Sequence, residues 1–306
     1  MHVHVVDGTY ELFRAYFGAP RVMSPGGEEI GAVRGLARSM LRLVGQEGAT
    51  HVGIAFDRTV ESFRNDLFDG YKTGEGLAPE LESQFHPAEE VCRALGFVVW
   101  SMTEFEADDA LATAAARYSA DPRVETVRLC TPDKDLAQCV QGQRIVTVDR
   151  RRGIVFDAAG VRGKFGVDPV SVPDYLALVG DSADGIPGIP RWGAKSASTV
   201  LAEYTHVEAI PDDPAAWNVD VRGARVLAAN LAARRDEAAL YKKLATLRTD
   251  APLLESVGDL HWRGPDVERL KRVCEELGDR FLVERADAVL RSVRCGDSVA
   301  SAPNAR

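Results

Sequence analysis

Short apolar runs alternate with amphipathic segments through the first half of the chain. Runs rich in β-branched and aromatic residues predict five strands, at residues 3–6, 51–56, 97–100, 124–130 and 144–148. The segments between them, such as 31–44 and 107–117, have the apolar spacing of helices that cover a sheet. This alternation predicts an α/β fold with a mainly parallel sheet flanked by helices.

From about residue 156 the pattern becomes helical, with glycine and proline concentrated in GDSADGIPGIPRWGAKSA. We therefore divide the chain into an α/β core at 1–155, a helical region at 156–292 and a small polar tail at 293–306. The tail composition predicts disorder. Residues 68–80, FDGYKTGEGLAPE, have three glycines and no apolar periodicity, which predicts a mobile loop lying across the site.

Composition adds limits to this picture. The 306 residues are 45% apolar, enough for a substantial core, and carry a net charge of −9. None of the five cysteines forms a CxxC pair, so we expect a reduced, cytoplasmic protein without structural zinc or disulfides. No signal peptide and no apolar run of about 18 residues is present, so a membrane location is not expected.

Carboxylates gather at the predicted strand ends and on one helix face. They occur in VHVVDG, VGIAFD, FEADD, TPDKD and VGDSADG, and are Asp7, Asp57, Glu106, Asp108, Asp109, Asp133, Asp135, Asp181 and Asp184. Functional groups of open parallel sheets lie beyond the carboxyl ends of the strands, so these acids are expected to meet there. Buried together they would repel one another by several kcal/mol per group, on the order given for buried ions, unless cations were present.

Oxygen ligands of this kind favour Mg²⁺ or Mn²⁺ over zinc. A pair of such ions roughly 4 Å apart suits in-line attack on a phosphodiester. Each motif also has a plainer explanation: Asp7 as a helix cap, FEADD as acids at a helix N-terminus, and TPDKD and GDSADG as capping and turn chemistry. The string VDGT also suggests a haloacid dehalogenase-type phosphatase, but Val5 occupies the position where that class needs a nucleophilic aspartate.

Taken in order, these motifs resemble the bacterial flap endonuclease and 5′–3′ exonuclease family, which includes the nuclease domain of DNA polymerase I. The resemblance covers about residues 2–250 and includes VVDG, SFRNDLFDGYK, FEADD, TPDKD and GDSADGIPGI. It implies a PIN-like nuclease core with a helical DNA-binding part. It also implies one metal at Asp7, Asp57, Glu106 and Asp108, and a second at Asp133, Asp135, Asp181 and Asp184, with Asp109 nearby.

GIPGIPRWGAKSA is similar to the family's helix–three-turn–helix, which holds a DNA backbone. Backbone amides of such a turn, followed by a helix N-terminus, bind phosphate without reading sequence. Gly188, Gly193 and Lys195 match the motif, Arg191 is a further candidate contact, and the resemblance implies a potassium ion held by carbonyl oxygens. Arg191 and Trp192 replace residues that are usually smaller or aliphatic. A packing turn without DNA is the alternative.

Several basic and aromatic positions also match the family. The resemblance makes Lys72 and Arg64 catalytic contacts to the scissile phosphate and Arg14 a DNA contact, and Tyr16 or Phe17 could stack on a base. Glu75 stands where the family commonly has an arginine, which weakens the case for threading of the 5′ strand. Residues 150–152, three arginines, are expected at the tip of a β-hairpin, as backbone contacts or as solvated side chains.

The resemblance implies cleavage of branched DNA, namely 5′ flaps and nicked or gapped duplexes, by a monomer that acts beside a separate polymerase in replication and repair. Two rivals stay open at this point. A PIN-type ribonuclease would prefer single-stranded RNA, and a catalytically inactive relative would bind DNA structures without cutting them.

Overall fold

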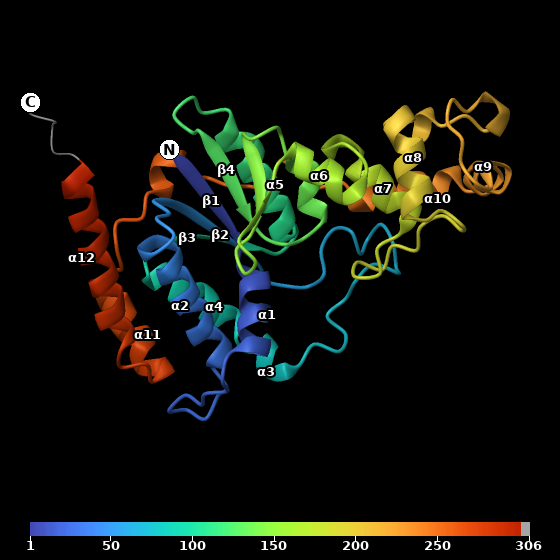
Figure 1. The fold of residues 1–306 in the computed structure, drawn as a ribbon. Helices are drawn as coiled ribbons and strands as arrows, with labels where there is room; N and C mark the ends of the chain where they lie inside the picture. Colours follow the sequence, from blue (N-terminus) through green and yellow to red (C-terminus); the bar gives the residue numbers. More distant parts are fainter. Residues whose placement is uncertain (301–306) are drawn as a thin grey trace, which may run out of the picture.

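The computed structural model describes residues 1–300, with side chains described as far as residue 295. A six-stranded sheet in the order β3-β2-β1-β4-β5-β6 forms the centre of the first half (Figure 1). Its strands are β1 His2–Asp7, β2 His51–Asp57, β3 Val98–Met102, β4 Thr126–Cys130, β5 Ile145–Asp149 and β6 Ile154–Phe156. The first five run parallel and β6 pairs antiparallel with β5, so the predicted strands and the predicted hairpin are confirmed.

Helices cover both faces of this sheet because its strands are apolar on both sides. One face packs against α1 Gly8–Gly18, α2 Gly31–Gly45 and α4 Phe85–Ala94, and the other against α5 Ala107–Ser119. A short helix, α3 Pro79–Glu82, precedes α4. Figure 1 shows α2 and α4 beside each other, below the strands.

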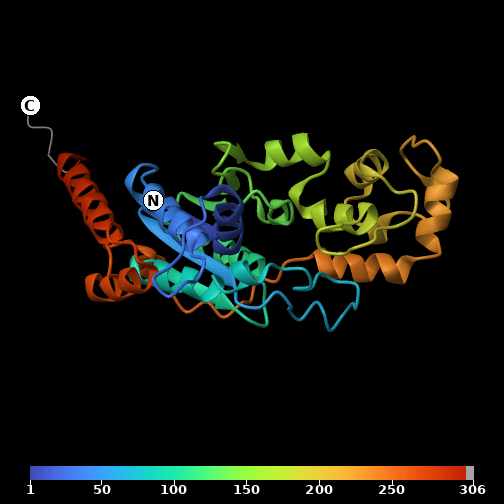
Figure 2. The same cartoon turned by 90° about the horizontal axis from the view of Figure 1, so that it is seen from below.

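A separate apolar core holds the helical region together. It contains α6 Ala158–Phe165, α7 Val172–Val179, α8 Ala194–Tyr204, α9 Ala224–Ala232 and α10 Arg235–Ala245. In Figures 1 and 2 these helices extend away from the sheet, so the molecule is elongated. No helix among the described residues is both long enough and apolar enough to cross a membrane.

The chain then returns to the α/β core, whereas the predicted helical region extends over 156–292. Leu253 and Leu260 pack on the α5 face, and Trp262 and Leu270 join the core beneath α2 and α4. Helices α11 Val267–Leu277 and α12 Leu282–Ala300 lie at the end of the molecule opposite α8 and α9 (Figure 1). Helix α12 continues to Ala300, so it includes 293–300 of the tail for which the sequence predicts disorder, and 301–306 lie outside the described residues.

Candidate metal centre and nucleic-acid interface

Three strand ends bring the predicted carboxylates to one edge of the sheet. Strand β1 ends at Asp7 and lies between β2, which ends at Asp57, and β4, which leads into the loop containing Asp133. Because the three strands are parallel, their carboxyl ends meet at the same edge. The predicted convergence of these acids is therefore present in the structure.

Hydrogen bonds fix the carboxylates of the first group. Asp7 caps α1 by accepting from the Tyr10 amide at 2.8 Å, and its other oxygen accepts from the Thr131 hydroxyl at 3.0 Å. Asp57 accepts from the Ala107 amide, at the start of α5, at 2.7 Å. The capping explanation for Asp7 is thus correct, but it uses one oxygen only.

The second group comes from two separate segments. Asp135 begins a short 3-10 helix after β4, whereas Asp181 and Asp184 lie in the turn after α7. One carboxylate oxygen from each of these three lies within 4.8 Å of the others. Asp135 Oδ1 is buried and has no hydrogen-bond partner among the residues that the structure describes. A buried, unpartnered anionic oxygen is costly, so this donor set fits a bound hard cation.

Burial and mutual repulsion shift the titration of these acids. Burial, together with the charges of Asp57 and Asp133, raises the pKa of Asp7 from 3.8 to about 7. Burial likewise raises the pKa values of Asp57, Asp108, Asp135 and Asp184. Asp133, Asp7 and Asp57 all act on Asp108, which places these four groups in one electrostatic cluster.

The cluster predicts a stability that depends on pH and on divalent cations. A carboxyl whose folded pKa is raised contributes stability that is fully present below its ordinary value of 3.8 and is lost as pH rises through about 7. In EDTA the melting temperature should therefore fall between pH 5 and pH 8, and the increase on adding Mg²⁺ should be larger at pH 8. Thermal unfolding followed by circular dichroism checks this. An equal effect of Mg²⁺ at both values would contradict the clustering.

Lys72 joins the two groups of acids. Its ammonium lies 3.0 Å from both Glu106 and Asp184, and its own amide donates to the Asp184 carbonyl at 3.1 Å. Burial alone would lower the pKa of Lys72, but Glu106 and Asp184 outweigh it and raise that pKa above its ordinary value. The structure places Lys72 beside the acids, and its contact with the scissile phosphate stays a prediction.

The predicted mobile loop is anchored where it passes the cluster. Tyr71 is buried, and its hydroxyl donates to Glu106 at 3.3 Å. Gly185 approaches so closely that a Cβ there would lie 2.1 Å from the Gly70 carbonyl oxygen. Residues beyond Lys72, including Glu75, line an open cavity of about 390 Å³ between this loop and Asp57.

Two predicted site residues form an internal ion pair instead. Arg64 and Asp109 are 1% and 0% exposed and bond through two parallel contacts of 2.8 Å. Arg64 also donates to the carbonyls of Leu244 and Thr246, while Asp109 accepts from the amides of Glu106 and Arg248. Their polar groups are used within the protein, so these contacts do not support Arg64 as a phosphate contact or Asp109 as a metal ligand, and both roles stay predictions.

Glu106 has the most elaborate support. The Ser62 hydroxyl donates to it at 2.6 Å, and Arg64 lies 3.3 Å away. Burial alone would raise the pKa of Glu106, but the charges of Lys72 and Arg64 outweigh burial and lower that pKa. Glu106 is therefore an ionised carboxylate at neutral pH. It is already paired with Lys72, and it adds one negative charge to the cluster.

Helices α7 and α8 and the turns between them form the predicted helix–three-turn–helix. Gly188 has φ 74°, and a Cβ there would lie 2.5 Å from the Gly180 nitrogen, so only glycine fits. The Ile189 amide donates to Leu178, which closes the turn onto α7. Gly193 is the N-cap of α8 and its amide donates to the Ser196 hydroxyl.

The basic residues of this turn are exposed. Arg191 and Lys195 face solvent on either side of Gly193, and Arg191 itself has a positive φ of 73°. Trp192 is buried, packs beside Trp217 and donates its indole proton to the Leu227 carbonyl at 3.1 Å. The departure at Trp192 is therefore a packing feature, and it leaves Arg191 and Lys195 available to an anion.

Arg14 and Tyr16 are less available than predicted. Arg14 pairs with Glu11 and donates to the Ser39 hydroxyl at 2.9 Å. Tyr16 is partly buried against the core, whereas its neighbour Phe17 is 80% exposed. The structure does not support a free DNA contact at Arg14, and Phe17 is the more exposed ring for stacking.

The hairpin arginines also behave differently from the prediction. Arg150 is nearly buried and pairs with Glu11 at 2.8 Å and with Glu47 at 2.9 Å. Arg151 and Arg152 are exposed. Only the last two therefore remain candidates for backbone contact.

Three residues at the cluster were missed. Thr131 and Ser62 donate to metal-cluster carboxylates, and Lys134 lies 2.6 Å from Asp181. Lys134 sits between the two acids of TPDKD, a signal that the sequence does contain. The hydroxyls of Thr131 and Ser62 give no comparable signal, since single hydroxyls occur throughout the chain.

Comparison with known protein families accounts for most of the chain. Residues 2–166 match the 5′–3′ exonuclease N-terminal resolvase-like domain, and residues 167–268 match the 5′–3′ exonuclease C-terminal SAM fold. The chain belongs to the 5′–3′ exonuclease family. The predicted resemblance and the predicted fold class, a PIN-like sheet with a helical C-terminal part, are confirmed.

Curated relatives support this membership. A 5′–3′ exonuclease of Aquifex aeolicus is 30% identical over 290 residues, covering 94% of this chain and 96% of the relative. DNA polymerase I of Bacillus caldotenax is 32% identical and that of Pseudomonas aeruginosa 35%, over 93% and 89% of this chain. The chain spans about a third of the length of these polymerases, 32% and 30%.

Solved structures share the fold. T5 5′-exonuclease with bound zinc has a TM-score of 0.65 at 17% identity, covering 96% of this chain and 100% of its own. The catalytic core of Rad2 in complex with DNA substrate has a TM-score of 0.60 at 15% identity, covering 95% and 91%. At these identities the likeness shows the fold of this 5′–3′ exonuclease family member and no more.

Proposed function

We propose that this chain is a divalent-metal-dependent 5′ nuclease that cleaves branched DNA, releasing 5′ flaps and short 5′ fragments. The observation that carries the proposal is the convergence of carboxylates from three strand ends and the α7–α8 turn around Lys72. Family membership supports the reaction class. Cleavage of flaps and of nicked or gapped duplexes, in the cytoplasm, by a monomer, completes the proposal.

The acid cluster would hold two or more Mg²⁺ or Mn²⁺ ions. Asp7, Asp57 and Asp108 would face one ion, and Asp135, Asp181 and Asp184 another, with Asp133 close to both groups. Such ions lower the pKa of bound water and neutralise charge on the phosphate. Zinc-bound T5 5′-exonuclease supports a divalent site in this fold, and the choice of Mg²⁺ or Mn²⁺ rests on the all-carboxylate donor set.

The protein's own groups would orient the substrate. Lys72, fixed by Glu106 and Asp184, would contact the scissile phosphate from the loop side. The turn at Gly188 and Gly193 would hold the duplex backbone through amides, with Arg191 and Lys195 beside it. A potassium ion held by carbonyls of the same turn would strengthen that contact. Binding should be independent of base sequence and weaken with salt.

A cleavage comparison tests the proposal against its rivals. A 5′-flap DNA and a single-stranded RNA of the same sequence are incubated with the protein in Mg²⁺, Mn²⁺ or EDTA. We expect flap cleavage that EDTA abolishes. Preferential RNA cleavage would favour a PIN-type ribonuclease, and flap binding in Mg²⁺ without product would indicate an inactive DNA binder.

Replacing Lys72 by alanine should slow the chemical step more than it weakens binding. Removing the ammonium takes one cation from the phosphate and leaves Glu106 and Asp184 without their partner. We expect kcat for flap DNA to fall about 10²- to 10³-fold, on the order seen for loss of one charge-stabilising donor. Single-turnover cleavage and binding in Ca²⁺ measure the two effects. The exposed Lys271→Ala is the control, and a defect in affinity alone would refute this role.

A further inference from the structure

The cations around the acid cluster differ in whether they already have a carboxylate partner. Lys72 pairs with Glu106 and Asp184, and Lys134 pairs with Asp181. Lys164, in the last turn of α6, forms no ion pair with any described residue. It is therefore a cation at the edge of the cluster that has no carboxylate in direct contact among the described residues.

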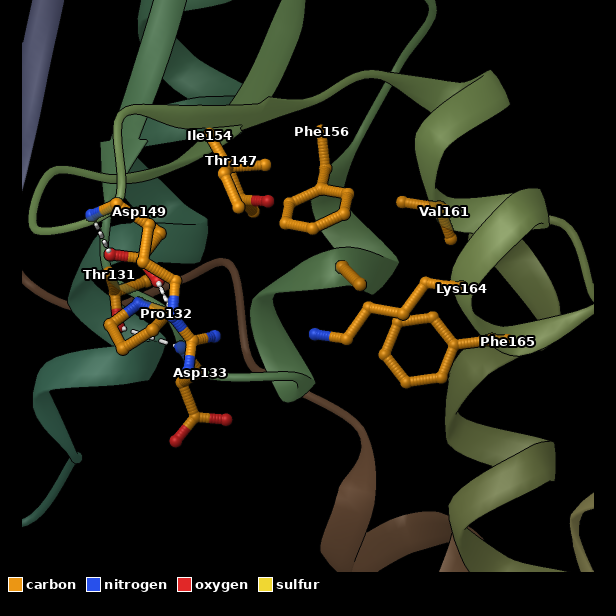
Figure 3. Close-up of a pocket in the computed structure, with 12 residues that line it drawn as sticks. Thr131, Pro132, Asp133, Thr147, Asp149, Ile154, Phe156, Val161, Lys164 and Phe165 are labelled. Atoms are coloured by element: carbon orange, nitrogen blue, oxygen red, sulfur yellow. Dashed lines mark hydrogen bonds and ion pairs between the residues drawn. The ribbon is translucent and has the colours of Figure 1, made fainter.

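Lys164 is nevertheless held in place. Its ammonium lies 5.2 Å from the centre of the Phe156 ring and 4.9 Å from that of Phe165. Figure 3 shows the side chain extending between these rings toward the side of the cavity where Asp133 lies. Contacts with aromatic faces restrict the ammonium without neutralising it. The side chain is thus positioned in advance for an anion from outside.

A cavity of about 90 Å³ opens at this ammonium (Figure 3). Thr131 and Asp133 line its end at the acid cluster, and Arg152 lines the wall on the β5–β6 hairpin. Arg152 is exposed and forms a long ion pair of 3.7 Å with Asp149, which also lines the cavity. An exposed pair of this kind contributes little and can exchange partners. The volume suits a phosphate group and is too small for a nucleoside.

The position of α6 connects the two places where DNA phosphates are proposed to bind. Its cavity includes Asp133 of the acid cluster. At the same end of α6 as Lys164, the C-cap Gly166 lies so close to α8 that a Cβ there would be 2.8 Å from the Ser198 Cβ. Helix α8 follows the glycine-rich turn. Figure 1 likewise shows α6 between the sheet and α8.

We infer that Lys164, with Arg152 across the cavity, binds one backbone phosphate of the DNA duplex between the acid cluster and the α7–α8 turn. This inference rests on the proposed function. Lys164 then contributes to binding of the duplex and not to the chemical step. Burial lowers the pKa of Lys164 and Asp133 opposes this, which fits an ammonium that lacks a close anion until DNA binds.

The alternative role for Lys164 is electrostatic and lies within the protein itself. Lys164 could simply offset the negative charge of Asp133 and Asp149 from a distance. In that case its loss would change the pH dependence and stability of the metal-free protein, but it would not remove a DNA phosphate contact. Salt dependence and chemically neutral phosphates distinguish the two roles.

The experiment measures binding of 5′-flap DNA in Ca²⁺ over a range of KCl for wild type, Lys164→Gln, Lys164→Arg and the control Arg162→Gln. Arg162 is also on α6 but is exposed and paired with Asp168. Lys164→Gln should weaken binding about 5- to 10-fold at low salt and reduce the slope of log K against log[KCl] by about 0.9. Lys164→Arg should retain the slope, and Arg162→Gln should match wild type.

A scan of single methylphosphonates along the duplex locates the contact. Neutralising one particular phosphate should weaken DNA binding by wild type and have no additional effect on binding by Lys164→Gln. In cleavage assays with unmodified flap DNA, Lys164→Gln should have a higher KM and an unchanged kcat. An unchanged slope in Lys164→Gln, equal losses in Lys164→Gln and Lys164→Arg, or full additivity at every phosphate would overturn the inference. Wild-type protein that neither binds nor cleaves the flap would instead overturn the proposed function.

Discussion

Asp135→Asn is expected to lower flap cleavage about 10³-fold, equivalent to about 4 kcal/mol of transition-state stabilisation. The substitution keeps the size of the side chain but removes the charge from a buried carboxylate. The Oδ1 of this carboxylate has no hydrogen-bond partner in the described part of the chain. Its neighbours Asp181 and Asp184 would then share one fewer anionic ligand. Flap binding in Ca²⁺ should persist, because the amides at Gly188 and Gly193 and the side chains of Arg191 and Lys195 do not depend on the charge of Asp135.

The same variant has a second readout that does not depend on activity. Loss of one charge relieves repulsion among the acids, so metal-free Asp135→Asn should melt at a higher temperature than metal-free wild type at pH 8. Its stabilisation by Mg²⁺ should be smaller. Asp121→Asn, which alters an exposed pair with Arg123, is the matched control. Full cleavage together with unchanged Mg²⁺ stabilisation would show that Asp135 is not a ligand.

The acid cluster could be predicted because its physics is local to each motif. An acid that directly follows an apolar strand is placed by the strand, and parallel strands carry their ends to one edge. Asp7 and Asp57 needed no further information. Asp135, Asp181 and Asp184 needed the family resemblance as well, since nothing in DxD or DxxD spacing specifies that a β4 loop meets the turn after α7.

The predictions that the contacts do not support, for Asp109, Arg14 and Arg150, share a different cause. FEADD places Glu106, Asp108 and Asp109 in the first turn of one helix, but helical spacing does not say which side faces the cluster. The orientation of Asp109 depends on Arg64, which lies 45 residues earlier in the chain and binds the Asp109 carboxylate in the protein interior. Arg14 and Arg150 were misjudged for the same reason, because their partner Glu11 is identified only by tertiary packing.

The predicted boundary of the helical region, 156–292, shows that a sequence pattern does not identify packing partners. The amphipathic pattern of α11 predicts a helix with one apolar face, and this was read as part of the helical region. The pattern does not identify what that face covers. In the structure Leu270 and Leu277 pack into the core beneath α2 and α4, so the last part of the chain stabilises the nuclease core.

Arg64→Ala is expected to reduce the free energy of unfolding by about 3–5 kcal/mol, the range for breaking a buried ion pair by removing one partner. Asp109 would be left fully buried with a charge that only backbone amides contact. The carbonyls of Leu244 and Thr246 would also lose a donor, which loosens the attachment of the segment after α10. Urea unfolding measures the loss.

Arg64→Lys separates the fork geometry from the charge. Lysine keeps the charge but cannot make two parallel contacts, so we expect it to recover only part of the lost stability. The exposed Arg123→Ala should have no measurable effect. Because Arg64 supports Glu106 but has no free donor for DNA, cleavage per folded molecule should fall much less than in Lys72→Ala. A stable Arg64→Ala protein with a comparable loss of kcat would return Arg64 to the catalytic site and contradict the internal role assigned by its contacts.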